Sequence, residues 1–313
     1  MNSEPSQCSS DLTPARLSSI LTEAGVYRFG IARAESVDPA EAAAYGDWIG
    51  RGCHAGMDYL DRYADVRSDP RLLLPGASSL IVCAFPYARP MLPEQGKLRI
   101  ASYALGDDYH EVVRKRLRKA ATEIDSRCGS VSRVCVDTAP LRERYWAVRA
   151  GLGFIGLNGQ LILPDAGSYF FIGTIITTLA LPPSEPCRLR CLGCRRCIIY
   201  CPGQAIASSG RPEIDARRCL SYLTIEHRGP FTVAPHLGNR VYGCDTCQTV
   251  CPHNIHAEPV EPLPEFQPRP ALLNLTRSDI LGMNADGFSQ LFRHSAVKRA
   301  GLSGLQRNAS ACD

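Results

Sequence analysis

The segment CLGCRRCIIYCP, residues 191–202, decides how this chain folds and what it holds. Its cysteines follow the spacing Cys-x2-Cys-x2-Cys-x3-Cys-Pro, which begins at Cys191 and ends at Pro202. Bacterial two-cluster ferredoxins use this spacing: three thiolates bind one [4Fe-4S] cubane and the fourth reaches the neighbouring cubane. A structural zinc site needs only four ligands and rarely shows this triplet followed by Cys-Pro. The segment therefore predicts an iron-sulfur electron-transfer protein.

A second cysteine motif, GCDTCQTVCP at residues 243–252, lacks one ligand, because Val241 stands where the first motif would place a thiol. Cys219 is the unassigned cysteine between the two motifs, and it restores the count of ligands to eight. Cys187 is left over, and a linker thiol without a role is favoured over a further ligand. We assign one cluster to a first quartet, made of Cys191, Cys194, Cys197 and Cys251. We assign the other cluster to a second quartet, made of Cys201, Cys219, Cys244 and Cys247.

Composition places the chain among globular proteins without a membrane span. It has 313 residues, 45% of them hydrophobic, and no apolar run approaches the length needed to cross a bilayer. The polar start MNSEPSQCSS has no signal-peptide pattern, so we expect a cytoplasmic protein. Fifteen cysteines in a large, unexported chain argue for metal rather than disulfides. The formal charge of +4 permits a nucleic-acid partner without indicating one.

Hydrophobic periodicity and turn residues predict alternating helices and strands before the cysteine motifs. The glycine-rich residues 151–159 follow a predicted helix rather than a strand, which argues against a dinucleotide-binding site. Proline-bearing linkers near residue 181 and at 259–270 suggest three parts, residues 1–180, 181–258 and 259–313, the last helical. We expect helices at residues 14–24, 39–51, 108–127 and 140–150, and strands at 27–32, 80–85, 130–136, 161–163 and 169–177.

Several longer motifs resemble those of the epoxyqueuosine reductases. They are VDTAPLRERYWAVRAGLGFIGLNG (136–159), GSYFFIGTIITTLALPP (167–183), CLGCRRCIIYCPGQAI (191–206), RRCLSYLTIEHRG (217–229) and GNRVYGCDTCQTVCPHN (238–254). The resemblance implies an enzyme that reduces epoxyqueuosine to queuosine at the wobble position of tRNA, using cobalamin, as cob(II)alamin, that two [4Fe-4S] clusters reduce. Its partners would be tRNA and a low-potential electron donor, with no membrane, and we expect a monomer.

The fold that this resemblance implies is of the α+β class. Residues 1–180 would form an α/β cobalamin-binding domain with a nitroreductase-like sheet and helices. Residues 181–258 would form a ferredoxin-like domain with both clusters, and residues 259–313 a short helical tail. The sequence departs from the family pattern at Leu157, where lysine is common, and at Ser102, where arginine is frequent.

By the same resemblance, Asp137 matches the acid that gives a proton to the opened epoxide oxygen and also contacts the cofactor. Such a carboxyl group must stay protonated near neutrality, which requires desolvation in a closed pocket. The alternative is that Asp137 caps the helix expected from Pro140. Arg144, about two turns along that helix, either faces the same pocket or forms a surface ion pair.

Further contacts are implied by the resemblance alone. The cobalamin contacts would come from main chain near Leu161 and Ile172, and from Thr224, Asp245 and Thr246. Candidate cofactor or tRNA contacts, each with a structural role as the alternative, are Tyr109, His110, His227 and Arg228.

Two other functions remain open from the sequence. A reductive dehalogenase would share cobalamin and paired cubanes, but such proteins typically carry a twin-arginine export signal, which this sequence lacks. A plain electron carrier would pass electrons to a partner and use its N-terminal part only for docking. Binding of cobalamin separates the carrier from both enzymes.

Overall fold

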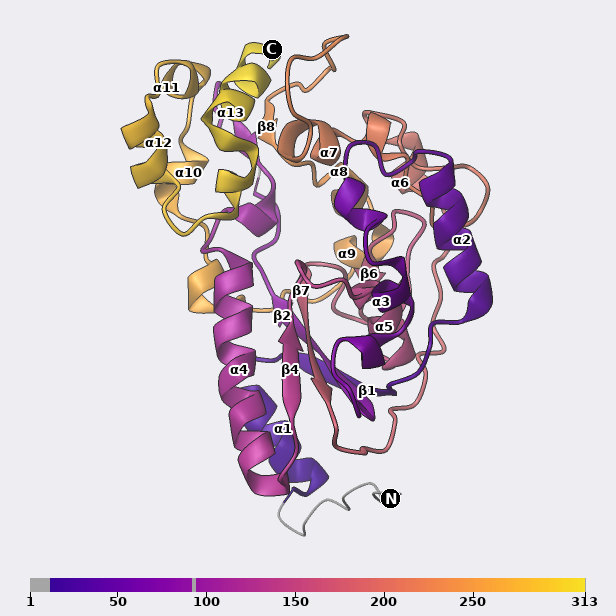
Figure 1. Cartoon of the computed structure of the whole chain (residues 1–313). Coiled ribbons are helices and arrows are strands. Elements are labelled where there is room, and N and C mark those ends of the chain that lie inside the picture. The colour runs from indigo at the N-terminus through magenta and orange to yellow at the C-terminus, as the bar shows by residue number, and fades with distance from the viewer. Residues whose placement is uncertain (1–11, 92–93, 313) are drawn as a thin grey trace.

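The computed structural model describes residues 12–91 and 94–312. The polar start of the chain, residues 1–11, lies outside the described part. At the centre is a four-stranded antiparallel sheet with the strand order β1-β2-β7-β4 (Figure 1). The strands of the structure are β1 (Arg28–Arg33), β2 (Ser79–Pro86), β3 (Arg99–Ile100), β4 (Ser132–Cys135), β5 (Phe154–Ile155), β6 (Leu161–Ile162), β7 (Phe170–Thr177) and β8 (Arg240–Tyr242).

Helices cover both faces of this sheet, which is why all eight residues of β2 are buried. Successive side chains of a strand point to opposite faces. Ile81 and Phe85 accordingly pack with the helices α1 (Pro14–Glu23) and α4 (Tyr109–Cys128). Leu80 and Val82 pack with α5 (Glu143–Arg149) on the other face. The continuous apolar run of β2 is therefore the signature of a strand enclosed by two helical layers.

Most of the predicted elements are confirmed to within one or two residues, but the helix expected from Pro140 begins only at Glu143. Residues 136–142 instead form a turn between β4 and α5. Asp137 therefore does not cap the helix, and that alternative is wrong. The remaining helices are α2 (Pro39–Gly50), α3 (Ala64–Ser68), α6 (Arg196–Ile199), α7 (Leu220–Ile225), α8 (Thr246–Thr249), α9 (Pro252–Ile255), α10 (Pro270–Leu273), α11 (Arg277–Leu281), α12 (Ala285–Leu291) and α13 (Gly301–Ser310).

A second lobe lies beyond one end of the sheet and contains the helices α10 to α13 (Figure 1). Its core joins residues from all three parts that the linkers suggested. Leu98 and Leu105 come from the first part and Leu237 from the second, and Phe292 and Leu305 come from the helical tail. A short parallel pair, β3 with β8, connects the first two parts. The tail is helical as expected, although it is divided into short helices.

The cysteine segment, residues 187–254, lies beside the second lobe at the same end of the sheet (Figure 1). It consists of loops, the strand β8 and the short helices α6, α7, α8 and α9, which follow or contain cluster cysteines. In the described residues, no helix is both long enough and apolar enough to cross a bilayer.

Candidate functional site

The first quartet surrounds a cavity. Cys191, Cys194, Cys197 and Cys251 all line it, although Cys251 comes from the second motif. Leu157, one of the departures from the family pattern, is buried against the same cavity. Burial raises the pKa of the Cys197 thiol to about 11, and the neighbouring sulfurs of Cys191, Cys251 and Cys194 add to that effect. Four thiols facing one cavity are the donor set that a cubane needs.

The second quartet gathers in the same way. Burial raises the pKa of the Cys247 thiol, and the next contributions come from Cys244, Cys219 and Cys201, its three partners in the quartet. A weaker one comes from Cys197, so the two quartets are adjacent. Cys187 is half-buried and does not line the cavity of the first quartet. Cys219, assigned by elimination, thus lies within electrostatic range of Cys247, and its role as a ligand stays a prediction.

A carboxylate–imidazole–carboxylate row lies at the end of the central sheet. His110 is in the first turn of α4, and its Nε2 lies 2.9 Å from Asp137 Oδ2. Its Nδ1 lies 2.7 Å from Oδ1 of Asp108, the residue that caps α4. Asp137 follows β4 and has a left-handed backbone, with φ of 52°. The end of a strand and the start of a helix therefore bring three titratable groups into one line.

The hydrogen bonds of this row favour a proton on His110 rather than on Asp137. Burial acts to lower the pKa of His110, but hydrogen bonds to Asp108 and Asp137 raise it to about 9. Burial also acts to raise the pKa of Asp137, yet the hydrogen bond and charge of His110 bring it below its ordinary value. The Asp137 side chain is 55% accessible. The closed pocket and protonated Asp137 expected from the sequence are not what this structure shows.

Glu143 and Arg144 complete the acid site from α5. Glu143 Oε1 accepts a hydrogen bond of 2.8 Å from the backbone N–H of Asp137. Burial, followed by the charge of Asp137, raises the pKa of Glu143 to about 8. The Arg144 charge lowers the pKa of both carboxyl groups. Arg144 is exposed, and no hydrogen bond or ion pair joins its side chain to any residue within 12–91 or 94–312.

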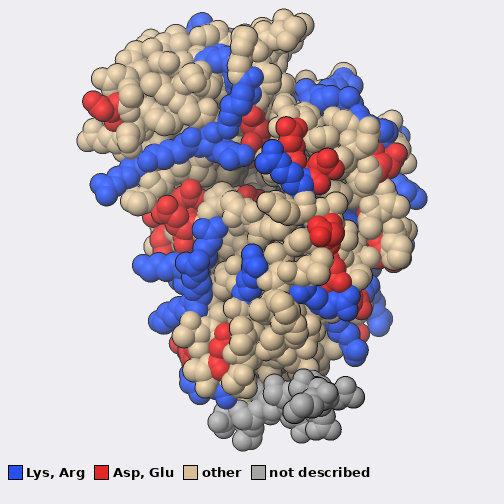
Figure 2. Space-filling view, in the orientation of Figure 1, with Lys and Arg blue, Asp and Glu red and all other residues tan. Residues whose placement is uncertain are grey.

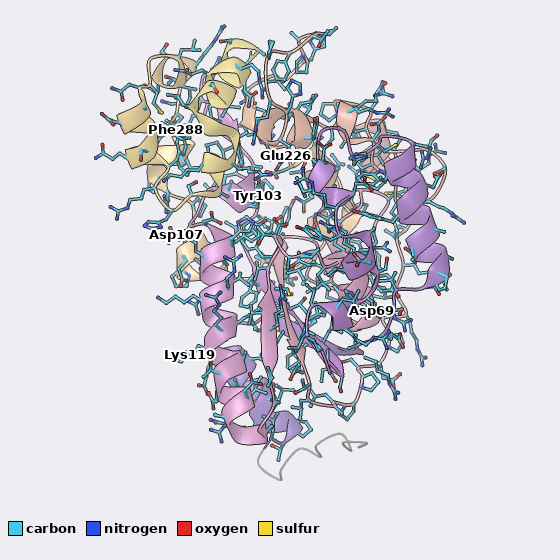
Figure 3. The ribbon with its side chains drawn as sticks, viewed as in Figure 1. Asp69, Tyr103, Asp107, Lys119, Glu226 and Phe288 are labelled. Carbon is cyan, nitrogen blue, oxygen red and sulfur yellow. The ribbon has the colours of Figure 1, made fainter. Side chains whose placement is uncertain are left out.

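Arg299 of the second lobe lies near the acid site, since the charge of Asp137 acts on it. Burial is the main reason that the pKa of Tyr59 is raised to about 12. The charges of Glu226 and Asp137 also raise this pKa, and the charge of Arg299 lowers it. Arg299 pairs with Glu226 through two hydrogen bonds of 2.9 and 2.8 Å and lies over the Tyr59 ring. Glu226 and Tyr103, both near Tyr242, lie where the lobes meet (Figure 3).

Tyr87 connects this pocket to the clusters. Its hydroxyl lies 3.4 Å from Oε1 of Gln248, the residue that follows Cys247 in the second quartet. Burial raises the pKa of Tyr87, and the charges of Asp245 on one side and Arg144 on the other both act on it. Tyr87 is therefore within electrostatic range of Arg144 in the acid site and of Asp245 between ligands of the second quartet.

The residues expected to hold cobalamin through side chains are already engaged within the protein. The Thr224 hydroxyl donates to the Leu220 carbonyl at 2.6 Å and accepts from the Gly243 N–H at 2.8 Å. Asp245 accepts two hydrogen bonds from Ser102, from its N–H at 2.9 Å and its hydroxyl at 3.1 Å. Ser102, the second departure from the family pattern, therefore fixes Asp245. The Thr246 hydroxyl accepts from Arg240 at 3.1 Å.

Unlike these side chains, the main chain at Ile172 faces a side of β7 that has no strand partner there. In an antiparallel ladder, hydrogen-bonded and non-hydrogen-bonded residue pairs alternate. Tyr87 and Tyr169 form a hydrogen-bonded pair, so Ala84 and Ile172 form a non-hydrogen-bonded one. The N–H and C=O groups of Ile172 therefore point away from β2. On that side β4 pairs with β7 only as far as Cys135 and Thr174. Continuing this register by two residues puts Ile172 opposite Asp137, where the chain has left the sheet. Ile172 thus offers main-chain groups without a strand partner beside the acid site, as a bound cofactor requires.

The other candidates are Leu161 and Tyr109 in the first part of the chain, and His227 and Arg228 in the second. Leu161 is buried in the pair β5–β6, and Tyr109 stacks on His110 with ring centroids 4.0 Å apart. His227 and Arg228 contact main-chain carbonyls. His227 Nε2 lies 3.2 Å from the Pro230 carbonyl, and Arg228 donates to the carbonyls of Ile225 and Arg299 at 2.8 Å. These contacts give the last two residues structural roles.

Two family models match the chain. Residues 67–138 match one described as epoxyqueuosine reductase QueG, DUF1730, and residues 190–254 match the 4Fe-4S double cluster binding domain. An epoxyqueuosine reductase of Gloeobacter violaceus is 38% identical over 307 residues, which are 95% of this chain and 94% of that protein. The chain belongs to the epoxyqueuosine reductase family. The match to the double cluster domain spans all eight cysteines of the two quartets and indicates two [4Fe-4S] clusters in residues 190–254.

Solved structures of epoxyqueuosine reductases agree with this membership. One, in complex with a tRNA-Tyr epoxyqueuosine-modified stem loop, is 28% identical with a TM-score of 0.86, over 95% of this chain and 80% of that one. A structure from Bacillus subtilis, with the same identity, coverage and TM-score, has its catalytic aspartate loop swung out of the active site. The α+β fold expected from the resemblance is therefore confirmed.

Sequence reasoning missed several residues of the site. One is Asp108, which lies two residues before the candidate His110 at a helix start, a spacing that could have indicated their pairing. Glu143 carried no signal, because it was expected inside a helix that started at Pro140. Ser102 and Tyr87 contact the cysteine segment from far away in the chain, and no local pattern indicates such contacts.

Proposed function

We propose that this protein reduces epoxyqueuosine to queuosine in tRNA, with cobalamin that receives electrons from the two [4Fe-4S] clusters. The observation that carries this proposal is the position of Tyr87. It connects Gln248, next to a ligand of the second quartet, with the acid site that contains Asp137 and Arg144. A redox cofactor between them would receive electrons from one side while its substrate receives a proton from the other.

We further propose that the parts of the chain divide the work. Residues 1–180 would hold most of the substrate and cobalamin contacts, residues 181–258 the clusters, and residues 259–313 the wall that Arg299 provides. In the first part, the main chain of Ile172 and the carboxyl group of Asp137 would contact cobalamin, with Leu161 nearby. In the second, Asp245 and Thr246 would face it from between the ligands of the second quartet. When bound, cobalamin supplies a low-valent cobalt centre that delivers electrons to the epoxide.

The residues of the acid site are suited to supply protons. Removing an epoxide oxygen as water consumes a pair of electrons and a pair of protons. At neutral pH His110, with its pKa of about 9, and Glu143, with its pKa of about 8, each carry a proton beside Asp137. Asp137 would pass a proton from His110 to the oxygen of the opened ring and be protonated again by its neighbours.

The charge on the surface fits an anionic partner. Lys and Arg side chains gather on α4 and where the lobes meet (Figure 2). The exposed basic residues of these elements include Lys115, Arg118, Lys119, Arg293, Lys298 and Arg299. Basic side chains contact phosphates wherever the backbone of RNA passes. We propose that tRNA approaches across this face, with its wobble base at the acid site.

Arg144→Gln is expected to weaken binding of the modified tRNA. We place the unpaired guanidinium of Arg144 against a substrate oxygen or phosphate, where loss of a charge-assisted hydrogen bond costs about tenfold in KM (~1.4 kcal/mol). Steady-state kinetics should show kcat within about threefold of wild type. Arg149→Gln is the matched control, since Arg149 lies on the same helix but pairs with Glu35. An unchanged KM for Arg144→Gln would remove this assignment.

The proposal is tested in cells by tRNA analysis. A bacterial strain that lacks its own epoxyqueuosine reductase accumulates the epoxide, and expression of this chain should convert it to queuosine. Mass spectrometry of digested tRNA measures both nucleosides. Persistence of the epoxide, with the protein soluble and loaded with iron, would contradict the proposal.

Uptake of cobalamin separates the enzyme from a plain electron carrier. Protein with both clusters, prepared without oxygen, should bind cob(II)alamin at about one per chain, with a change in its absorption and EPR spectra. An electron carrier would leave the cobalamin spectrum unchanged after gel filtration. That outcome would exclude the cofactor even if the clusters were intact.

A further inference from the structure

The turn that carries Asp137 has an unusual backbone. Asp137 has a φ of 52°, a left-handed conformation that is uncommon for a residue with a Cβ. Two three-residue turns shape this segment: Thr138 N–H donates to the Val136 carbonyl at 2.6 Å, and Leu141 N–H to the Ala139 carbonyl at 2.7 Å. The first of these turns has Asp137 at its centre, so it shapes the Asp137 backbone without joining it to another element.

Glu143 supplies the contact that joins the Asp137 backbone to α5. Its Oε1 accepts the Asp137 N–H at 2.8 Å, across the full width of the turn. Glu143 is the first residue of α5, a helix anchored in the core by Trp146 and Ala147, which are fully buried. The Glu143 carboxyl group therefore joins the 136–142 turn to a helix that is anchored in the core. With the turn in this position, Asp137 Oδ2 reaches Nε2 of His110 at 2.9 Å.

We propose that Glu143 is a positioning residue that latches the 136–142 turn in the conformation in which Asp137 meets His110. This inference rests on the proposed function, because it concerns the residue that acts there as the acid. The Bacillus subtilis relative, whose catalytic aspartate loop is swung out, shows that a loop of this kind has two positions in the family. Without the Glu143 oxygen, the turn loses the side-chain acceptor that holds Asp137 inward.

The ionisation of Glu143 gives the latch a dependence on pH. Its pKa rises from 4.5 to about 8 with the turn closed, through burial first and then the charge of Asp137. The closed turn thus binds more protons than an open turn with an exposed Glu143, and it loses stability as pH rises across that interval. Above about pH 8 the loss is complete.

Other charged groups face Glu143 and act in the same interval. On α5, Arg144 favours the ionised form of Glu143, and from α4 the charge of His110 does the same. Tyr109 on α4 and Cys135 on β4 also feel the Glu143 charge. His110 itself titrates with a pKa of about 9. Only the comparison of wild type with a variant that lacks the Glu143 proton isolates the contribution of this residue.

Two variants of similar size separate the latch from other roles of Glu143. Glu143→Gln keeps an oxygen acceptor for the Asp137 N–H but does not ionise, whereas Glu143→Met fills the space without an oxygen. Amide hydrogen exchange, read by mass spectrometry on the peptide that spans residues 136–143, reports opening of the turn. We expect exchange about three- to tenfold faster in Glu143→Met than in wild type, and near wild type in Glu143→Gln.

Turnover and pH complete the test. Turnover of epoxyqueuosine tRNA should fall about three- to tenfold or more in Glu143→Met and be restored in Glu143→Gln. Exchange in wild type should accelerate between about pH 5 and pH 8 beyond the intrinsic effect of pH, and this excess should be smaller in Glu143→Gln. Iron content and melting temperature identify any variant that fails to fold; in that event the pH comparison of wild type with Glu143→Gln decides.

The latch would be overturned if Glu143→Met left exchange of the turn unchanged, or if Glu143→Gln opened the turn as fully as Glu143→Met. These exchange measurements need no substrate. Failure of wild-type protein to convert the tRNA would therefore count against the proposed function alone, while the exchange data would still decide the role of Glu143.

Discussion

Asp137→Asn is expected to lower the turnover of epoxyqueuosine tRNA by about 10²- to 10⁴-fold, the range typical for loss of a positioned general acid. Asparagine retains the shape of the side chain and tolerates the left-handed backbone that Asp137 adopts, with its φ of 52°. It cannot accept the proton of His110 and pass it on. Single-turnover kinetics on reconstituted protein measures the effect on the chemical step.

The control for this substitution is Asp165→Asn. Asp165 also has a left-handed backbone, with φ of 62°, but it is exposed in the loop after β6, outside the acid site. It should leave turnover within about twofold of wild type. If Asp137→Asn kept turnover within about threefold while its clusters and cobalamin were intact, Asp137 would not be the acid.

Cys219→Ser is expected to remove one cluster and with it nearly all turnover. Cys219 is the ligand that the second motif lacks, and its removal leaves three thiols in the second quartet. Iron should fall from about eight to about four per chain, since each cubane holds about four. Electrons could then no longer pass between the first quartet and the pocket beside Asp245. Iron analysis and EPR of the reduced protein measure the loss.

Cys187→Ser is the matched control, because Cys187 belongs to the same segment but to neither quartet. It should keep about eight irons and wild-type turnover. Eight irons in Cys219→Ser, or four in Cys187→Ser, would show that the quartets are wrongly assigned.

The cluster ligands could be predicted because their spacing is local. Three thiols of the first quartet lie within seven residues of sequence, so short loops alone direct them to one cavity. The fourth, Cys251, is sixty residues away, and the cross-over of paired motifs predicted that it would join them; it lines the same cavity. Cys219 required elimination, and its role as a ligand stays a prediction.

The acid site could be predicted only in part. Resemblance indicated Asp137, yet the protonation state depends on His110 and Asp108, which approach it from another helix. The pairing of Glu143 with Asp137 depends on a turn that replaces the first residues of a predicted helix. Proline at position 140 indicated where a helix might start, but its neighbours formed tight turns instead.

The second lobe shows the same limit on a larger scale. Apolar residues such as Leu98 and Phe292 could be recognised as buried, but their common core joins residues almost two hundred positions apart. The pairing of β3 with β8 joins strands of two and three residues, too short to be read from periodicity. Such contacts follow from packing of the whole chain.

The central claim is that clusters, cobalamin and acid site act together on a tRNA epoxide. Nucleoside analysis after an anaerobic reaction of reconstituted protein, cobalamin, a low-potential reductant and epoxyqueuosine tRNA tests it most directly. We predict that queuosine appears only when all of these are present. Unchanged epoxyqueuosine in the presence of protein with about eight irons and bound cobalamin would contradict the account.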